Sequence, residues 1–405
     1  MATKEQKVGR VPNLRFPGFE GEWEEKKLGE IAERVIRKNK ENNQNILTIS
    51  AQFGLISQLE FFNKSVSAKD VTGYYLLHKN DFAYNKSYSN GYPMGAIKRL
   101  NRYEKGVVST LYICFKFIDC IDNTFVEQSF ETGNQNSEIE KVAQEGARNH
   151  GLLNIGVSDF FNIKLIIPSL PEQIQIASFL TLIDERIQCQ NKIIEGLKSL
   201  KVASCKKIFS RELSFKDDNG EDFTEWEEKN GGDLFDSISN KNHNSDLPIL
   251  AISQEFGAVP REMINYQISV TDKSIESYKV VEVGDFIISL RSFQGGIEYS
   301  NYKGICSPAY IILHAKVLID NTFYKYYFKT DLYIQQLCSK LEGIRDGKMI
   351  SYKYFSEITL PFPSLPEQNK IANFLSGIDE KITIETSLLR QLKLQKQYLL
   401  RQMFI

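Results

Sequence analysis

The sequence predicts an α+β fold with an internal pseudo-twofold repeat: two domains of similar fold are separated by two long helices that form an antiparallel coiled coil. Three observations predict this fold. A twenty-residue segment occurs twice, shorter motifs repeat in the same order through both halves, and apolar residues recur at heptad spacing from each long segment onward. The long segment is PSLPEQIQIASFLTLIDERI at Pro168–Ile187 and PSLPEQNKIANFLSGIDEKI at Pro363–Ile382, 195 residues further on.

The shorter motifs extend the duplication to the residues that precede each long segment. Their offset drifts from about 203 to 195 residues, as expected when loops of unequal length join the same core elements. The paired motifs are Glu22–Lys26 with Glu225–Lys229, Ile46–Gly54 with Ile249–Gly257, Asn80–Phe82 with Gly284–Phe286, and Asp122–Phe125 with Asp320–Phe323. The chain is therefore predicted to be two copies of one unit, each a globular domain followed by a helix.

Hydrophobic periodicity predicts a mixture of strands and helices in each domain. In the first domain we expect strands at Asn45–Ser50, Val107–Phe117 and Asn162–Ile167, and helices at Glu24–Arg37 and Phe125–Phe130. In the second we expect strands at Pro248–Ser253, Asp285–Leu290 and Ala309–Ala315, and a helix at Thr322–Leu341. The predicted boundaries are 1–167 and 226–362 for the two domains, and 168–225 and 363–405 for the central and C-terminal helical spacers.

Each helical spacer begins with a sequence typical of a helix N-terminus. Ser169 and Ser364 each precede a glutamate by three positions, which predicts a capping box. Spacing of 3.5 residues over four heptads then predicts a coiled-coil seam. Because neither helix has another in its own unit to bury against, we expect the two to pair, and a pseudo-twofold axis makes that pair antiparallel. The seam residues are Ile176, Leu180, Ile183, Ile187, Ile194 and Leu197 in the first helix, and Ile371, Leu375, Ile378, Ile382, Leu389 and Leu392 in the second.

Length and composition bound the class of protein. A chain of 405 residues is long enough for two or three domains. Its apolar runs are shorter than the ~18–20 residues of a membrane span, and its N-terminus lacks the apolar segment of a secretory signal. The six cysteines have no CxxC spacing, which favours reduced thiols in a cytoplasmic protein over a disulfide or zinc framework. A net charge of −1 means that any DNA-binding face is local.

These residues resemble the specificity (S) subunit of a type I restriction-modification system. The resemblance covers essentially the whole chain. It rests on PSLPEQ followed by a long helix, used twice, on the opening LRFPGF…EWEEKKLGEI, and on its central echo LSFKDDNGEDFTEWEEK. It implies two target-recognition domains, each of which recognises one half of a bipartite, asymmetric site in double-stranded DNA. It also implies that the helical spacers hold these domains apart and dock two methyltransferase (modification) subunits, with restriction/translocase subunits joining in the full complex.

The loops that fail to repeat are the candidate DNA contacts. Arginine offers two hydrogen bonds to guanine, and asparagine or glutamine offers two to adenine, while lysine and serine hold phosphates. A solvated turn, or a helix cap with a surface arginine, is the alternative interpretation of these loops. The candidates are Lys86, Ser87, Tyr88, Asn90, Tyr92, Arg148, Asn149 and His150 in the first domain, and Arg291, Ser292, Gln294, Arg345 and Lys348 in the second.

Sequence motifs for catalysis are absent. The chain has no Asp/Asn-Pro-Pro-Tyr/Phe sequence for amino-methyl transfer and no glycine-rich loop for a cofactor or nucleotide. The four histidines have neither an i+4 partner nor a neighbouring cysteine, so we expect no metal site, no cofactor and no catalytic residue. The leading hypothesis is a non-catalytic DNA-recognition subunit. Two alternatives stay open: a stand-alone nuclease or methyltransferase with unrecognised motifs, and an interaction scaffold with vestigial recognition domains.

Overall fold

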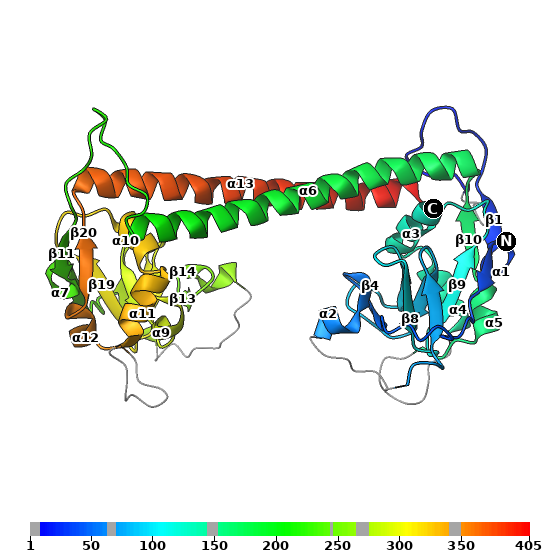
Figure 1. Ribbon diagram of the computed structural model, residues 1–405, viewed down its shortest axis with the longest axis horizontal. Coiled ribbons are helices and arrows are strands. Elements are labelled where there is room, and N and C mark those ends of the chain that lie inside the picture. The colour runs from blue at the N-terminus through cyan, green and yellow to red at the C-terminus, as the bar shows by residue number, and fades with distance from the viewer. Residues whose placement is uncertain (1–8, 63–69, 144–152, 244–245, 265–274, 340–349) are drawn as a thin grey trace, which may run out of the picture. The chain divides into compact units, whose positions relative to one another are not determined.

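The computed structural model describes residues 9–62, 70–143, 153–243, 246–264, 275–339 and 350–405 of the chain (Figure 1). The chain divides into two compact units. The first contains the residues up to Gln190 together with Leu388–Ile405, and the second contains Asn191–Ser387. Each unit combines helices with antiparallel sheets, as the α+β prediction requires.

The described part of the first unit is built around one four-stranded antiparallel sheet. Its order is β2 (Ala32–Arg34), β9 (Ile113–Phe117), β6 (Phe82–Asn85) and β7 (Ala96–Arg99). Two-stranded pairs surround it: β1 (Glu24–Lys27) with β10 (Lys164–Ile167), β3 (Leu47–Ser50) with β4 (Gly54–Ser57), and β5 (Tyr75–His78) with β8 (Lys105–Val108). The short helices are α1 (Leu28–Ile31), α2 (Gln58–Phe62), α3 (Asn123–Thr132), α4 (Asn136–Val142) and α5 (Val157–Phe161).

The second unit repeats this order of strands. Its four-stranded sheet is β12 (Phe235–Ile238), β19 (Ile311–Ala315), β16 (Phe286–Ile288) and β17 (Glu298–Tyr299). The pairs are β11 (Glu227–Asn230) with β20 (Thr359–Phe362), β13 (Leu250–Ser253) with β14 (Gly257–Pro260), and β15 (Lys279–Val281) with β18 (Gly304–Cys306). Its short helices are α7 (Gly231–Leu234), η1 (Arg261–Met263), α9 (Ser292–Gly295), α10 (Asn321–Tyr327), α11 (Asp331–Ser339) and α12 (Tyr352–Ser356). The predicted duplication is therefore confirmed.

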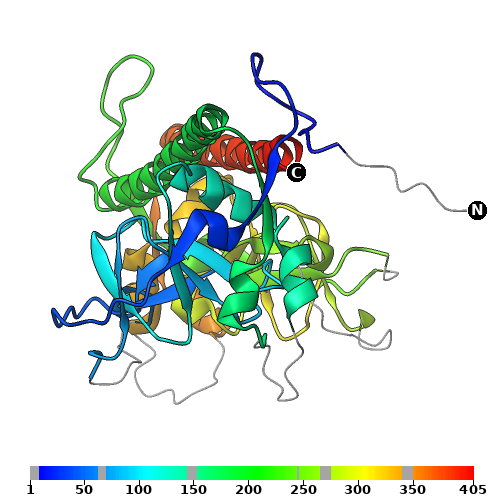
Figure 2. The same cartoon turned by 90° about the vertical axis from the view of Figure 1, so that its right-hand side faces the viewer.

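Two long helices, α6 (Leu170–Phe209) and α13 (Leu365–Met403), each contribute one half to each unit. In the first unit, the ring of Phe404, just after α13, lies 6.4 Å from Trp23 and 5.2 Å from Phe125. In the second, Phe209 at the end of α6 makes the equivalent contacts. Each unit thus holds the start of one helix and the end of the other, so the two helix segments within a unit run antiparallel. In Figure 2 the red end of α13 lies beside the green helix α6.

Two reciprocal ion pairs join the helices. In the first unit Lys396 of α13 binds Asp184 of α6, with Nζ and Oδ1 2.6 Å apart. In the second unit Lys201 of α6 binds Asp379 of α13 at the same distance. The two pairs join equivalent positions of the repeat, because the two lysines and the two aspartates are each 195 residues apart in the sequence. Because all four side chains are partly exposed, the pairs specify register more than they add stability.

The predicted seam residues are all buried or partly buried. The first two seam residues of each helix pack into the core of the domain that precedes the helix. They are Ile176 and Leu180 in α6, and Ile371 and Leu375 in α13. The early part of each seam therefore anchors a helix to its own domain. The buried seam residues are Ile176, Leu180, Ile194, Ile371, Leu375, Ile378 and Leu392, and the partly buried ones are Ile183, Ile187, Leu197, Ile382 and Leu389.

One predicted helix is wrong. Glu24–Arg37 forms β1, α1 and β2 in succession. Glutamate and lysine favour helices, but the backbone of this segment finds its partners in Lys164–Ile167, which lies far away in sequence. Val107–Phe117 similarly contains the end of β8 and the whole of β9, and the described part of Thr322–Leu341 contains two helices. The bounds of these strands and helices depend on pairing with distant segments and on turns of the chain. Local hydrophobic periodicity does not reveal either.

A buried glutamine joins each long helix to its own domain. Gln173 donates from Nε2 to the Pro168 carbonyl and accepts at Oε1 from the Asp122 amide, both at 2.9 Å. Gln368 makes the same two bonds in the second unit, at 2.8 and 2.9 Å. The Asp122 carboxylate also caps α3 by accepting from a backbone amide of that helix. Each long helix is thus tied to the first turn of the helix that packs beside it.

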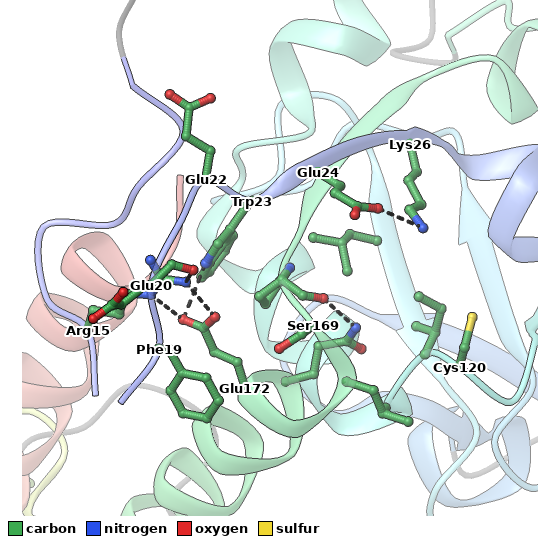
Figure 3. Close-up of a pocket in the computed structure, with 15 residues that line it drawn as sticks. Arg15, Phe19, Glu20, Glu22, Trp23, Glu24, Lys26, Cys120, Ser169 and Glu172 are labelled. Carbon is green, nitrogen blue, oxygen red and sulfur yellow. Dashed lines mark hydrogen bonds and ion pairs between the residues drawn. The ribbon is translucent and has the colours of Figure 1, made fainter. Parts of the chain in front are cut away.

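A neighbouring glutamate, Glu172, reinforces this joint in the first unit. It is 1% exposed, and its two carboxylate oxygens accept from Nε and Nη2 of Arg15 at 2.8 Å. The Trp23 indole donates to the same carboxylate at 3.3 Å (Figure 3). A surface pocket of about 340 Å³ lies beside this cluster. Glu172 therefore binds both Arg15 and Trp23 at the start of α6.

The equivalent Glu367 is equally buried but less well paired. Within the described chain, its Oε2 atom has no hydrogen-bond partner, and neither has the hydroxyl of Ser364. The capping box predicted for this helix is therefore wrong, because the serine hydroxyl binds no backbone amide. Burial raises the pKa of the Glu367 carboxyl. The repeated PSLPEQ motif thus places one glutamate in a strong pair and the other in a poorly satisfied site.

We expect the two glutamates to affect stability in opposite ways. Because the folded state raises the pKa of Glu367, the folded protein holds this proton more tightly, and the second unit gains stability as pH falls through the folded pKa. Glu367→Gln should remove this gain and leave stability at neutral pH equal to wild type or higher. Glu172→Gln should lower stability by about 1–3 kcal/mol, because it weakens charged hydrogen bonds. Urea unfolding at neutral and mildly acidic pH measures both; a Glu367→Gln protein less stable than wild type at neutral pH contradicts the argument.

Candidate nucleic-acid interface

The loop between β6 and β7 carries five of the candidate residues in the first domain. Tyr88 has 63% of its surface exposed. Asn90 is exposed as well, whereas Lys86 and Ser87 are partly buried. The carbonyl of Lys86 accepts a hydrogen bond from the Leu153 amide at 3.0 Å. The loop therefore has a fixed base and an exposed polar and aromatic tip.

Tyr92, at the far end of this loop, takes part in an internal network. Its hydroxyl accepts from Nζ of Lys98 at 2.9 Å and donates to Glu131. Lys98 also binds Glu131 directly, with Nζ and Oε1 2.5 Å apart. Burial raises the pKa of the Tyr92 phenol. Since the hydroxyl is engaged within the domain, Tyr92 supports the loop and offers no free hydrogen bond to a base.

The equivalent loop of the second domain contains α9. Arg291 and Gln294 are exposed there, so their side chains are available as donors. Ser292 is 1% exposed, and its hydroxyl accepts from the Ser289 amide at 2.9 Å. Gln254, in the turn between β13 and β14, donates to the Arg291 carbonyl at 3.0 Å. Arg291 and Gln294 are thus presented to solvent, while Ser292 shapes the turn that presents them.

The remaining candidates lie outside the described residues. The candidates outside the described residues are Arg148, Asn149, His150, Arg345 and Lys348.

Two exposed phenylalanines were missed by the sequence argument. Phe53 and Phe256 occupy the same place in the turns that follow β3 and β13, and are 60% and 52% exposed. The preceding serine, Ser50 or Ser253, accepts a hydrogen bond from the phenylalanine amide at 3.2 or 3.4 Å. The signal was present in ISAQFG and ISQEFG, where an apolar residue is kept inside a turn in both copies. An exposed aromatic ring therefore occupies the same turn in both domains.

In the first domain the exposed ring belongs to a larger apolar patch. The ring centroid of Phe53 lies 6.3 Å from that of Phe61, which lies 4.7 Å from that of Phe62. Both partners are in α2 and are more than 40% exposed. Among the described residues this patch of three exposed aromatic side chains is found in the first domain, while its first member is common to both.

Reactive and metal-binding groups are sparse in the part of the chain that the structure describes. No three His, Cys, Asp or Glu side chains there are grouped as metal ligands. The six cysteines are free, and burial raises the pKa of Cys114 and Cys306 to about 12, which makes these thiols unreactive. None of the described helices is both long and apolar enough to cross a membrane.

The sequence of each half matches one protein family. Residues 20–199 and 224–394 both match the type I restriction modification DNA specificity domain. The chain belongs to this family, and its internal repeat is two copies of that domain.

Two proteins of Methanocaldococcus jannaschii are similar in sequence. The putative type I restriction enzyme MjaX specificity subunit is 30% identical over 261 residues, which cover 60% of this chain and 59% of that protein. The type I restriction enzyme MjaVIII specificity subunit is 28% identical over 282 residues, which cover 64% of this chain and 65% of that protein. The similarity thus spans less than two thirds of either relative.

Solved structures have the same fold. The S subunit of a type I restriction-modification system from M. genitalium has a TM-score of 0.53 at 17% identity, covering 98% of this chain and 99% of that one. A chain from a study of complex assembly and conformational transition of the type I R-M system has a TM-score of 0.55 at 18% identity, covering 94% and 97%. At these identities the likeness concerns the fold alone.

Proposed function

We propose that this chain is the DNA sequence-recognition subunit of a type I restriction-modification complex and has no catalytic activity of its own. Each domain binds one half of a bipartite, asymmetric site in double-stranded DNA. The observation that carries the proposal is the pair of specificity domains with one framework and dissimilar loops, between β6 and β7 in one and between β16 and β17 in the other. A duplicated framework with different polar loops suits the recognition of two different half-sites.

The proposed DNA contacts are loop residues that are accessible or that lie outside the described residues. Tyr92 and Ser292 are assigned a supporting role, because their hydroxyls are engaged within their domains. Phe53 and Phe256 are added as apolar contacts. The polar contacts are Lys86, Ser87, Tyr88, Asn90, Arg148, Asn149 and His150 in the first domain, and Arg291, Gln294, Arg345 and Lys348 in the second.

The exposed apolar residues of the long helices suit the docking of partner subunits. Apolar side chains that recur on an exposed helix face are typical of protein interfaces. We assign to them two methyltransferase subunits, with restriction/translocase subunits joining in the full complex. The residues are Leu182, Leu200 and Val202 of α6, and Ile384, Leu394 and Tyr398 of α13, all more than half exposed.

The remaining assignments follow from the same proposal. We assign residues 1–167 and 226–362 to the two target-recognition domains, and 168–225 and 363–405 to helical spacers that set the separation of the half-sites. Free thiols are consistent with work in the cytoplasm. No cofactor and no membrane are assigned to the chain.

Exchange of one domain tests the function. Replacing residues 226–362 by the same domain of another such protein should change one half of the methylated sequence and leave the other half intact. The measurement is methylome sequencing of cells that express the chain with its cognate methyltransferase. A change in both halves contradicts modular recognition, and no bipartite motif with the wild-type chain contradicts the function. Turnover by the purified chain alone with S-adenosylmethionine, Mg²⁺ and DNA would favour a stand-alone enzyme.

The helical spacers are tested by their length. One face of B-DNA recurs every ~34–36 Å, so we expect half-site centres about one turn apart. Inserting one heptad into both α6 and α13 keeps the seam in register and should lengthen the gap between the half-sites. The same methylome measurement reports the gap, and an unchanged gap would show that the helices do not set it.

The exposed phenylalanines are tested by truncation. Phe53→Ala with Phe256→Ala should weaken binding of the cognate duplex by more than about tenfold, because each aromatic contact with a base contributes about 1–3 kcal/mol. The unfolding transition should not shift, since both rings are exposed. Leu318→Ala, which removes a side chain that is 80% exposed outside these turns, is the matched control. If DNA affinity is unchanged while affinity for the methyltransferase falls, the rings belong to a protein interface.

A further inference from the structure

The two domains place opposite charges at one position of their central sheets. In the first domain, the backbone register pairs Ala83 of β6 with Lys98 of β7. In the second, it pairs Ile287 of β16 with Glu298 of β17. Phe82 and Phe286 begin the corresponding strands β6 and β16. Each pairs with the residue that directly follows Lys98 or Glu298, so Lys98 and Glu298 are structural equivalents.

The partners of these two residues are reversed as well. Lys98 binds Glu131 of α3, with Nζ and Oε1 2.5 Å apart. Glu298 binds Lys329, which follows α10, with Oε1 and Nζ 2.6 Å apart. The side chain on the strand is the buried one in both domains, at 8% and 2% exposed, and the partner is 27% and 33% exposed. An ion pair is therefore present at equivalent positions of both domains with the opposite polarity.

Each ion pair also holds the loop that precedes it. In the first domain, both Lys98 and Glu131 bond to the hydroxyl of Tyr92, near the end of the loop between β6 and β7. In the second, Lys329 bonds to the carbonyl of Gly295 in α9. The lysine is the donor in both, although it comes from the strand in one domain and from the helical side in the other.

The buried setting makes each pair a rigid attachment. Burial raises the pKa of Glu298 and lowers the pKa of Lys329, so each group depends on the other to remain charged. Loss of one partner from such a pair leaves a buried group without compensation. The polarity contributes nothing to DNA attraction, because each pair is neutral as a whole. Each ion pair is therefore better explained by its hold on the loop than by an attraction to DNA.

We propose that the ion pairs Lys98–Glu131 and Glu298–Lys329 position the recognition loops, and that each controls base discrimination at one half-site only. This rests on the proposed function, since it assigns a cause to the specificity of those same loops. Lys98, Glu131, Glu298 and Lys329 are positioning residues that do not touch DNA. Tyr92 transmits the position of the first pair to its loop, and the Gly295 carbonyl does so for the second.

The test measures discrimination, with the full chain in complex with its methyltransferase. The duplexes are the site that the wild-type complex methylates and the same site with one base pair changed in either half. Tyr92→Phe keeps the ring and removes the hydroxyl. We expect the ratio of the dissociation constants, changed over cognate, to fall about fivefold to tenfold for the half-site of the first domain, and not for the other half. Lys329→Met should give the converse result.

The ratio of the two dissociation constants distinguishes a loss of loop positioning from a loss of protein stability. A variant that merely unfolds in part lowers the active fraction equally for all duplexes and leaves the ratio unchanged. Lys98→Glu should lose discrimination, and adding Glu131→Lys should restore it to within about threefold of wild type, because the second domain uses this polarity. Lys303→Met, which breaks an exposed ion pair in the second domain, is the matched control.

Two outcomes would overturn the inference. Unchanged ratios for both Tyr92→Phe and Lys329→Met contradict it while the proposed function stands. A wild-type complex that does not distinguish the cognate duplex from the changed ones contradicts the proposed function, and the inference with it. If Lys98→Glu does not fold, the two milder variants decide the question.

Discussion

The structure depends on one side-chain amide at the start of each long helix. Gln173 and Gln368 are almost fully buried, and each uses both ends of its amide, one toward a proline carbonyl and one toward an aspartate amide. Only a side chain with a donor and an acceptor in one plane satisfies both groups, and an unsatisfied buried group costs about 1–3 kcal/mol. The aspartate in turn caps α3 or α10, and Glu131 at the end of α3 or Lys329 just after α10 holds the loop that precedes β7 or β17. The direction of the long helix and the position of the loop are therefore fixed through the same short helix.

The glutamates beside these glutamines differ in how well they are paired at the start of the two long helices. Glu172 has Arg15 and Trp23, whereas Glu367 has an oxygen without a hydrogen-bond partner among the described residues. The helix starts in the same way in both units, so the glutamine bonds are sufficient to hold it. The glutamate adds stability where an arginine binds it through two hydrogen bonds, as Arg15 binds Glu172. The same sequence motif thus has different energies in its two copies, because residues outside the motif complete it.

The repeat made the duplication, the long helices and their antiparallel pairing predictable, because these are visible as matched letters and heptad spacing. The strand at Glu24–Lys27 was not predictable, because its backbone partner lies about 140 residues further along the chain and its composition favours a helix. Tyr92 and Ser292 look like solvent-facing loop residues in sequence, and only their partners Glu131 and Ser289 reveal that they point inward. Phe53 and Phe256 were predictable as exposed residues, since packing does not require an apolar residue in the same turn of both copies.

The reversed ion pairs show how two copies of one framework can hold loops of different sequence. A buried pair restricts change, because replacing one partner alone leaves an uncompensated charge, yet reversing both partners preserves the attachment. The loops that these pairs hold are free to differ, provided that each still offers an acceptor to the lysine. The end of the opposite helix adds a second condition, since Phe209 packs against Trp226 and Phe323 of the second domain. A domain is therefore interchangeable only if it keeps that aromatic site together with its own ion pair, whatever the sequence of its loop.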